Sequence, residues 1–319
     1  MERFNMTGKE RAPRNRTLQL MEPERKEFFS RCLIPGKSAL TLPEITCRTL
    51  CGDFFKSAAL LPRGFADLII ADPPYNLTKS FNGKLFSRKS AAAYEKYTRQ
   101  WLELTAPLLK PGGSIYVCCD WSTSLIVGRV LAEFFTLRNR ITWQREKGRG
   151  AAANWKNSAE DIFFATAGNE YTFNLNAVKM RRRVIAPYRD NGCPKDWVED
   201  SDGRFRDSCP GNFWDDITVP FWSMPENTDH PTQKPEKLLA KLILASSNEH
   251  DMIFDPFLGS GSTSVTAKKL NRRYCGVEMD EYYCACAEKR LALADEEKSI
   301  QGFDGKVFYE RNTIPGKMP

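Results

Sequence analysis

The sequence is poor in histidine and lacks the cysteine motifs that usually hold a metal ion. Its 319 residues include two histidines and ten cysteines, and no two cysteines form a C-x-x-C motif. Structural zinc sites take their ligands from such clusters. We therefore expect no metal site, and we expect the cysteines to be reduced thiols, most of them small core residues.

The chain also lacks a long apolar run. A membrane-spanning helix needs about 20 apolar residues in succession, whereas LLAKLILA at 238–245 is short and is interrupted by Lys241. The N-terminal end is polar and basic, without the apolar core of a secretory signal. These absences predict a soluble cytoplasmic protein with no membrane partner.

The composition fits one large domain with an insert, or two domains. Hydrophobic residues make up 41% of the chain, enough for a sizeable core. Lysine and arginine (47) exceed aspartate and glutamate (40), which gives a net charge of +7. This excess suits a polyanionic partner but does not identify one.

Apolar strands alternate with helices along much of the chain. Strands that are apolar on both faces indicate a parallel sheet covered by helices on both sides. The sequence therefore predicts an α/β fold with a doubly wound, mostly parallel sheet. The expected strands are 45–50, 66–72, 114–119, 137–144, 161–167, 251–255 and 273–278.

The second of these strands ends in an unusual corner, DPPY at 72–75. Each proline fixes φ and removes a backbone donor, so the chain can neither continue the sheet nor enter a helix there. Asp72, Pro73, Pro74 and Tyr75 are thus held rigidly at the carboxyl end of a strand, where open α/β sheets place their ligands. We interpret this corner as a candidate catalytic site.

A glycine turn, DPFLGSGST at 255–263, follows the strand 251–255. Gly259 and Gly261 allow the backbone to approach a ligand, and the helix that begins near Ser262 directs its N–H groups at the same place. Glu278, at the end of the next strand, can accept both hydroxyls of a ribose. Asp255 would repel a pyrophosphate but attract an ammonium group, so the pattern favours S-adenosylmethionine over a dinucleotide.

Three segments in this order, DPPY (72–75), HPTQKP (230–235) and DPFLGSGST (255–263), resemble one family of enzymes. This family is the permuted β-class of S-adenosylmethionine-dependent DNA adenine-N6 methyltransferases. The resemblance covers about residues 45–292. It implies a seven-stranded, circularly permuted sheet with one antiparallel strand.

The resemblance also implies roles for individual residues. Asp53 is similar to the residue that binds the adenine amino group of the cofactor, with Phe54 beside the ring. His230, Thr232 and Lys234 resemble the segment that contacts the methionine moiety. The complete cofactor set is Asp53, Phe54, Asp72, His230, Thr232, Lys234, Asp255, Phe257, Gly259, Gly261, Ser262 and Glu278.

The chemistry expected at the DPPY corner is methylation of an exocyclic amine. The lone pair of adenine N6 is delocalised into the ring, so catalysis must localise it. The carboxylate of Asp72 and the carbonyl of Pro73 can each accept one N6 hydrogen and stabilise the charge that develops. Tyr75 can stack on a flipped base and orient it. The resemblance thus implies direct transfer to adenine N6 in double-stranded DNA.

Residues 170–225 break the β-α-β rhythm and hold no clean period. In position they resemble the target-recognition region of the family, where Lys179, Arg181, Arg182 and Arg183 could contact DNA. Two loops, 76–90 and 145–157, suit closure over DNA. Trp143, Trp155, Trp197 and Trp214 are expected in the core rather than as wedges between bases.

The expected organisation has five parts. These are an N-terminal peripheral or mobile arm (1–40), a catalytic half (41–169), an irregular target-recognition insert (170–228), a cofactor-binding half (229–297) and a C-terminal tail (298–319). The family further suggests a homodimer and a cognate restriction endonuclease as partners.

Three alternatives remain open from the sequence. Cytosine N4 is also an exocyclic amine, although relatives that methylate it more often have serine where Asp72 stands. A dinucleotide-dependent oxidoreductase would share the fold, but DPPY and Asp255 argue against it. A nucleic-acid-binding module without catalysis would not need the complete set of motifs.

Overall fold

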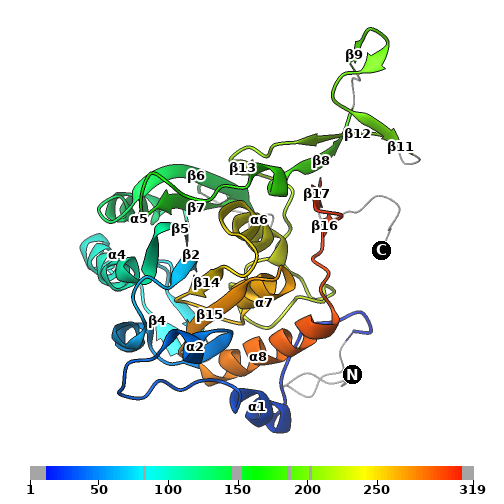
Figure 1. Cartoon of the computed structure of the whole chain (residues 1–319). Helices are drawn as coiled ribbons and strands as arrows, with labels where there is room; N and C mark the ends of the chain where they lie inside the picture. Colours follow the sequence, from blue (N-terminus) through cyan, green and yellow to red (C-terminus); the bar gives the residue numbers. More distant parts are fainter. Residues whose placement is uncertain (1–11, 82–83, 146–152, 185–187, 201–202, 311–319) are drawn as a thin grey trace.

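The computed structural model describes residues 12–81, 84–145, 153–184, 188–200 and 203–310. An eight-stranded sheet forms the centre of the molecule (Figure 1), in the order β1-β15-β14-β2-β5-β7-β6-β13. Its strands are β1 (Arg48–Cys51), β2 (Ala66–Ala71), β5 (Leu109–Cys119), β6 (Thr136–Gln144), β7 (Ala159–Thr166), β13 (Phe213–Trp214), β14 (Met252–Asp255) and β15 (Arg273–Glu278).

The predicted mostly parallel sheet is confirmed, and β7 is its antiparallel strand. β7 pairs antiparallel with both β5 and β6, whereas the other neighbours pair in parallel. The expectation of seven strands is wrong by one, because the two-residue strand β13 joins the edge beside β6. A two-residue strand is too short to leave a periodic pattern in the sequence.

Helices cover both faces of the central sheet. One apolar core lies between the sheet and α3, α4 and α5, and a second lies between the sheet and α6, α7 and α8. Figure 1 shows the two groups on opposite sides of the strands. The helices are α2 (Leu42–Ile45), α3 (Phe54–Ser57), α4 (Ala91–Thr105), α5 (Ser124–Leu131), α6 (Glu236–Ser246), α7 (Ser262–Lys269) and α8 (Glu281–Glu296).

Capping and buried aromatic residues explain the longest helices. In α4, the Ser90 hydroxyl accepts from Ala93 N at 3.2 Å, and Tyr94 and Trp101 are buried against the sheet. Pro107 lies in the 3-10 turn that follows α4, as expected of a residue that cannot continue the helix. Asp280 caps α8 by accepting from Tyr282 N at 3.0 Å.

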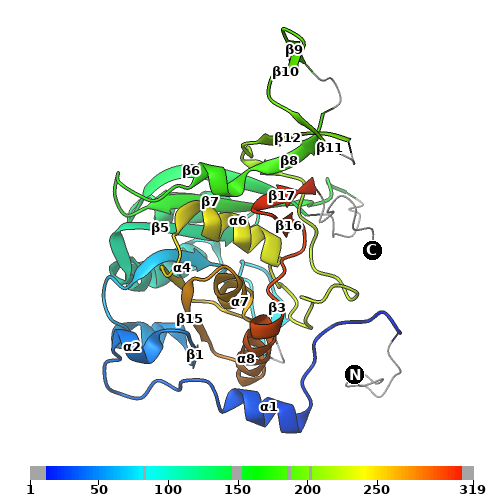
Figure 2. The same cartoon turned by 45° about the vertical axis from the view of Figure 1, so that its right-hand side comes forward.

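The inserted region is more regular than the sequence suggested. It contributes β8 (Met180–Arg183), β11 (Val198–Asp200) and β12 (Gly203–Ser208) to a second sheet, and β9 (Arg189–Asp190) and β10 (Cys193–Pro194) form a separate hairpin. Figures 1 and 2 show these strands projecting from the body of the molecule. The expectation of an irregular insert is therefore wrong, because strands of two to six residues with charges on both faces leave no alternation in the sequence.

Segments near both ends of the chain pack on this framework. α1 (Glu22–Phe29) lies against α8, and Leu20 is buried beside Tyr282 and Tyr283. β17 (Val307–Tyr309) pairs with β8, and β16 (Phe303–Asp304) pairs with β17, so residues 303–309 complete the second sheet. Residues 1–11 and 311–319, from the expected arm and tail, lie outside the described residues.

Two findings concern transmembrane helices and cysteines. None of the helices in the described part of the chain is both long and apolar enough to cross a membrane. All ten cysteines lie in described segments and are free thiols, and six of them are buried. The described residues contain no cluster of three or more side chains suited to holding a metal ion.

Candidate active site

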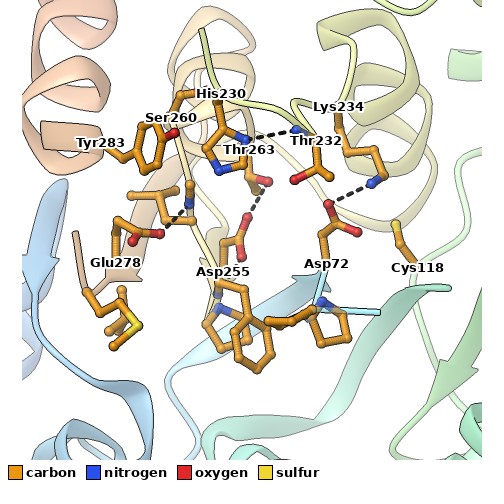
Figure 3. Close-up of a pocket in the computed structure, with 18 of the residues that line it drawn as sticks. Asp72, Cys118, His230, Thr232, Lys234, Asp255, Ser260, Thr263, Glu278 and Tyr283 are labelled. Atoms are coloured by element: carbon orange, nitrogen blue, oxygen red, sulfur yellow. Dashed lines mark hydrogen bonds and ion pairs between the residues drawn. The ribbon is translucent and has the colours of Figure 1, made fainter. Parts of the chain in front are cut away.

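The DPPY corner and the glycine turn line one cavity of about 500 Å³ at the carboxyl edge of the sheet (Figure 3). They meet because β2 and β14 are neighbouring parallel strands, with Leu68 opposite Ile253 and Ile69 opposite Phe254. The carboxyl ends of these strands therefore open at the same place, although the motifs lie about 180 residues apart in the sequence. A cavity of this size suits a small-molecule ligand.

The two glycines of the turn have no room for a side chain. Gly261 has φ of +86°, and an added Cβ would lie 2.6 Å from Ala287 Cβ in α8. Gly259 has φ of +57°, and its Cβ would lie 3.0 Å from His230 Nε2. Glycine is required here both for the left-handed backbone and for close packing. Gly259 thus presents bare backbone to the cavity, whereas Gly261 does not line the cavity and instead allows the turn to pack closely on α8.

Asp255 is buried at the end of β14 and is held by two donors. Its carboxylate accepts from Phe257 N at 2.9 Å and from the Thr263 hydroxyl at 2.6 Å. Burial raises the pKa of Asp255 to about 7, although both hydrogen bonds oppose this effect. A cationic ligand at this position would favour the ionised carboxylate.

Glu278, at the end of β15, is also fixed from both sides. Its Oε2 accepts from Gly259 N at 2.9 Å and its Oε1 accepts from Asp280 N at 2.8 Å. Burial raises its pKa. The carboxylate is thereby oriented along the cavity wall (Figure 3), and each oxygen retains a lone pair with which it can accept from a ligand.

Asp53 and two phenylalanines form the wall beside Glu278. Asp53 is the N-cap of α3 and accepts from Phe55 N at 3.0 Å. Phe54 lies with its ring centroid 5.9 Å from that of Phe257, and all three residues line the cavity. Asp53 and Glu278 lie close together because their strands are neighbours, with Cys51 of β1 paired with Glu278 of β15.

The HPTQKP segment crosses the cavity on the side of α6 and α8 (Figure 3). The His230 ring packs edge-on against Tyr283, with centroids 4.5 Å apart, and its Nδ1 accepts from Thr232 N at 3.4 Å. Burial, with the charge of Lys234 nearby, lowers the pKa of His230 to about 3, so the imidazole is neutral. Ser262 and Thr232 also line the cavity.

Lys234 makes its ion pairs with the DPPY corner. Its Nζ lies 2.6 Å from Asp72 Oδ2 and 3.4 Å from Glu160 Oε2, and its side chain is 7% exposed. Burial would lower the pKa of Lys234, but the two carboxylates outweigh it and raise that pKa. The ammonium group is therefore charged and fixed against Asp72.

The Tyr75 hydroxyl also contacts Asp72. It donates to Asp72 Oδ1 at 2.9 Å and lies 3.2 Å from Glu160 Oε2. Burial, with these two carboxylates, raises the pKa of Tyr75 well above its ordinary value, so the phenol keeps its proton. Both oxygens of Asp72 therefore have a donor in this structure, and the Tyr75 ring is held by its hydroxyl.

The sequence analysis missed Glu160 and Arg145. Glu160 is buried near the start of β7 and forms an ion pair with Arg145. Because β7 is antiparallel to its neighbours, its beginning lies at the edge where they end. No local pattern in the sequence marks Glu160, because its place at this edge depends on the direction of β7.

The residues predicted to contact DNA lie on or beside β8, away from the cavity. Arg181 pairs with Asp207 at 2.8 Å, and Arg182 lies 3.9 Å from Glu310. Lys179 is half-buried before the strand, and Arg183 is exposed. In the two loops expected to close over DNA, residues 82–83 and 146–152 lie outside the described part of the chain.

Comparison with known proteins identifies the family. A family model described as DNA methylase, covering N6 and N4 methyltransferases, matches residues 66–289. Type II methyltransferase M.HpaI of Haemophilus parainfluenzae is 31% identical over 260 residues, which span 81% of this chain and 76% of that protein. DNA adenine methyltransferase YhdJ of Escherichia coli (strain K12) is 33% identical over 254 residues, which span 76% of this chain and 82% of that protein.

Solved structures share the fold at lower identity. The PvuII cytosine-N4-specific DNA methyltransferase has a TM-score of 0.55 at 17% identity, covering 84% of this chain and 95% of that one. A putative DNA modification methylase of Thermus thermophilus, in complex with S-adenosyl-L-methionine, has a TM-score of 0.54 at 19% identity, covering 85% and 99%. Together with the match over residues 66–289, these findings show that the chain belongs to the DNA methylase family of N6 and N4 methyltransferases.

Proposed function

We propose that this chain is a DNA adenine methyltransferase that transfers a methyl group from S-adenosylmethionine to N6 of a flipped adenine in double-stranded DNA. The observation that carries the proposal is the single cavity lined by both Asp72 and Gly259 of the glycine turn. Adenine is favoured by the name of the YhdJ relative and by the aspartate in the DPPY corner. The order along the chain, with β2 before β14, supports a circular permutation.

The residues present fit S-adenosylmethionine. The glycine turn offers bare backbone, Asp255 offers a buried carboxylate for an ammonium group, and Glu278 offers acceptors for a ribose diol. Asp53 would accept from the adenine amino group, and Phe54 and Phe257 would flank the ring. His230, Thr232 and Ser262 would contact the methionine part. When bound, this cofactor supplies an electrophilic methyl group.

The DPPY corner would act by orienting the target amine. Asp72 Oδ1 and the Pro73 carbonyl accept its two hydrogens, which shifts electron density onto nitrogen and stabilises the positive charge that develops. Because Lys234 is fixed on Oδ2, we assign the amine to Oδ1, which the Tyr75 hydroxyl also contacts. The two prolines restrict the backbone, and the Tyr75 ring would stack on the base. No proton needs to leave the base before the methyl group arrives; the methylated nitrogen would then release one of its two hydrogens as a proton to solvent.

DNA binding is assigned to the projecting insert. Lys179, Arg181, Arg182 and Arg183 lie on or beside β8, in a sheet whose other strands are also short. Basic residues on such an element suit contacts to phosphates and base edges. From the resemblance, the proposal also includes homodimerisation, a cognate restriction endonuclease and a cytoplasmic location.

The direct test is incubation with S-adenosylmethionine carrying a labelled methyl group and plasmid DNA, followed by digestion to nucleosides. The proposal predicts label in N6-methyladenine, and the Asp72→Ala variant should give none. Label in N4-methylcytosine would overturn the assignment to adenine. A folded protein that transfers no label to any DNA tested would overturn the function.

A further inference from the structure

Each oxygen of Asp72 already holds one donor in this structure, so an amine that reaches the carboxylate must compete with a donor that is in place. Its Oδ2 holds the Lys234 ammonium at 2.6 Å, and its Oδ1 holds the Tyr75 hydroxyl at 2.9 Å. The ion pair with Lys234 is buried and strong, whereas the phenol is a neutral donor. An entering amine, which gains positive charge as the methyl group arrives, would therefore compete with the Tyr75 hydroxyl for Oδ1, because the hydroxyl is the more weakly held of the two donors.

A displaced phenol in this buried place needs another acceptor, and Glu160 Oε2 already lies 3.2 Å from it. A buried hydroxyl that is left without a partner is destabilising. We propose that Glu160 is a positioning residue that takes over the Tyr75 hydroxyl when the target amine reaches Asp72, so that the tyrosine ring stays in place. This inference rests on the proposed function and adds to it a residue that does not touch the substrate.

The surroundings of Glu160 fit this role. Its other oxygen pairs with Arg145, and Oε2 also lies 3.4 Å from Lys234 Nζ. Burial would raise the pKa of Glu160, but Lys234 and Arg145 together lower it, so the group is ionised and remains an acceptor. Two carboxylates and two cations, Asp72 and Glu160 with Lys234 and Arg145, form a neutral set.

Glu160 lies behind the wall of the cavity. Tyr75, Lys234 and Arg145 are among the described lining residues, whereas Glu160 is not. Its influence on a bound base would therefore pass through these neighbours. Its substitution should change the rate of transfer with little effect on the affinity for S-adenosylmethionine.

The test is a double-mutant cycle in the full-length protein. Single-turnover methyl transfer to duplex DNA, at saturating S-adenosylmethionine and DNA, is measured for the wild type, Glu160→Gln, Tyr75→Phe and the double variant. We expect Glu160→Gln to slow transfer about 30-fold, while the Kd for S-adenosylmethionine changes by less than about threefold. Tyr75→Phe should cost about fivefold in the wild type and less than about twofold in the Glu160→Gln background, because the neutral amide oxygen of that variant holds the hydroxyl less strongly than the carboxylate does.

Equal costs of Tyr75→Phe in both backgrounds would overturn the proposal, as would a near-native rate for Glu160→Gln. Glu133→Gln is the matched control, since Glu133 also pairs with an arginine but is 42% exposed on the surface. If Glu160→Gln does not fold, Glu160→Asp replaces it in the test, because aspartate retains the charge on a shorter side chain. A transfer rate of Glu160→Asp within about twofold of the wild type would then overturn the proposal. A wild type that does not methylate DNA refutes the proposed function itself, whereas N4-methylcytosine as product changes only the target base.

Discussion

The cavity and the projecting insert both contain ion-paired residues, but these side chains are buried in the cavity and exposed in the insert. Around Asp72, the ion-paired side chains of Lys234 and Glu160 are 7% and 5% exposed. In the insert, the pair Arg204–Glu199 is 43% and 54% exposed, and Arg206–Asp196 is 40% and 52% exposed. The same kinds of residues thus form a rigid, dry network in one region and a solvated surface in the other.

This difference matches the two tasks that a DNA methyltransferase must perform. Buried pairs are costly to break, so they keep an acceptor such as Asp72 in one orientation. Exposed pairs contribute about 0–1 kcal/mol each, so an arginine can exchange its carboxylate for a phosphate at little cost. The buried pairs thus suit the orienting role that we propose for the cavity, and the exposed pairs suit the DNA contact that we propose for the insert.

The largest effect is expected from breaking the buried network at its centre. Asp72→Ala removes the acceptor for the target amine and should lower the rate of methyl transfer at least about 10³-fold. The Kd for S-adenosylmethionine, measured by calorimetry, should change by less than about threefold. Asp67→Asn is the control, because Asp67 lies on the same strand and pairs with Lys110 at the opposite edge. Near-native turnover of Asp72→Ala would contradict the catalytic assignment.

The second prediction concerns how much the close packing of the glycine turn contributes to stability. Gly261→Ala places a Cβ against Ala287 in a left-handed turn and should lower the free energy of unfolding by about 3 kcal/mol. Urea denaturation without cofactor measures this directly. Gly305→Ala, with φ of +55° and no atom within 4 Å of the added Cβ, should cost only about 1 kcal/mol. If both substitutions lowered the free energy of unfolding equally, close packing against α8 would not be the reason that Gly261 is required.

The sequence predicted the central sheet and most of the cavity because both depend on local signals. Apolar strands ended by prolines mark where a parallel sheet opens, and Asp72 and Asp255 lie at such ends, while Glu278 ends the apolar strand that follows the glycine turn. Glu160 was missed because its place depends on the direction of β7, which no local pattern records. Trp155, expected in the core, is 93% exposed, because an aromatic residue outside a periodic segment carries no burial signal.

The contacts inside the cavity could not be predicted either. The sequence assigned Lys234 to the cofactor, whereas in this structure its Nζ lies on Asp72. It assigned the Tyr75 ring to a base, but it gave no partner for the hydroxyl. Such partners depend on side chains that converge from β2, β7 and the segment before α6, and their distances follow only from tertiary packing.

The third prediction concerns the pH dependence of stability that follows from the buried carboxyl group of Asp255. Because burial raises its pKa to about 7, this group stabilises the cofactor-free fold fully below about pH 4 and loses that contribution as pH rises through 7. Asp255→Asn cannot ionise, so its stability relative to the wild type should rise by about 2 kcal/mol between pH 5 and 8. Urea denaturation at several pH values measures this difference. An unchanging difference would contradict the raised pKa, and Asp190→Asn, in the exposed hairpin, is the control.

The smallest effect is expected where the insert exchanges one exposed ion pair. Arg182→Ala removes a side chain that is 48% exposed and 3.9 Å from Glu310, so the free energy of unfolding should change by less than about 0.5 kcal/mol. If Arg182 contacts a phosphate, the slope of log K against log salt for duplex DNA should become shallower by about 1. Arg25→Ala, on α1 at the other end of the molecule (Figure 1), should leave the slope unchanged. If the wild type, Arg182→Ala and Arg25→Ala gave equal slopes, Arg182 would not contact a phosphate. A large loss of stability instead would mean that the surface of the insert is held as firmly as the cavity.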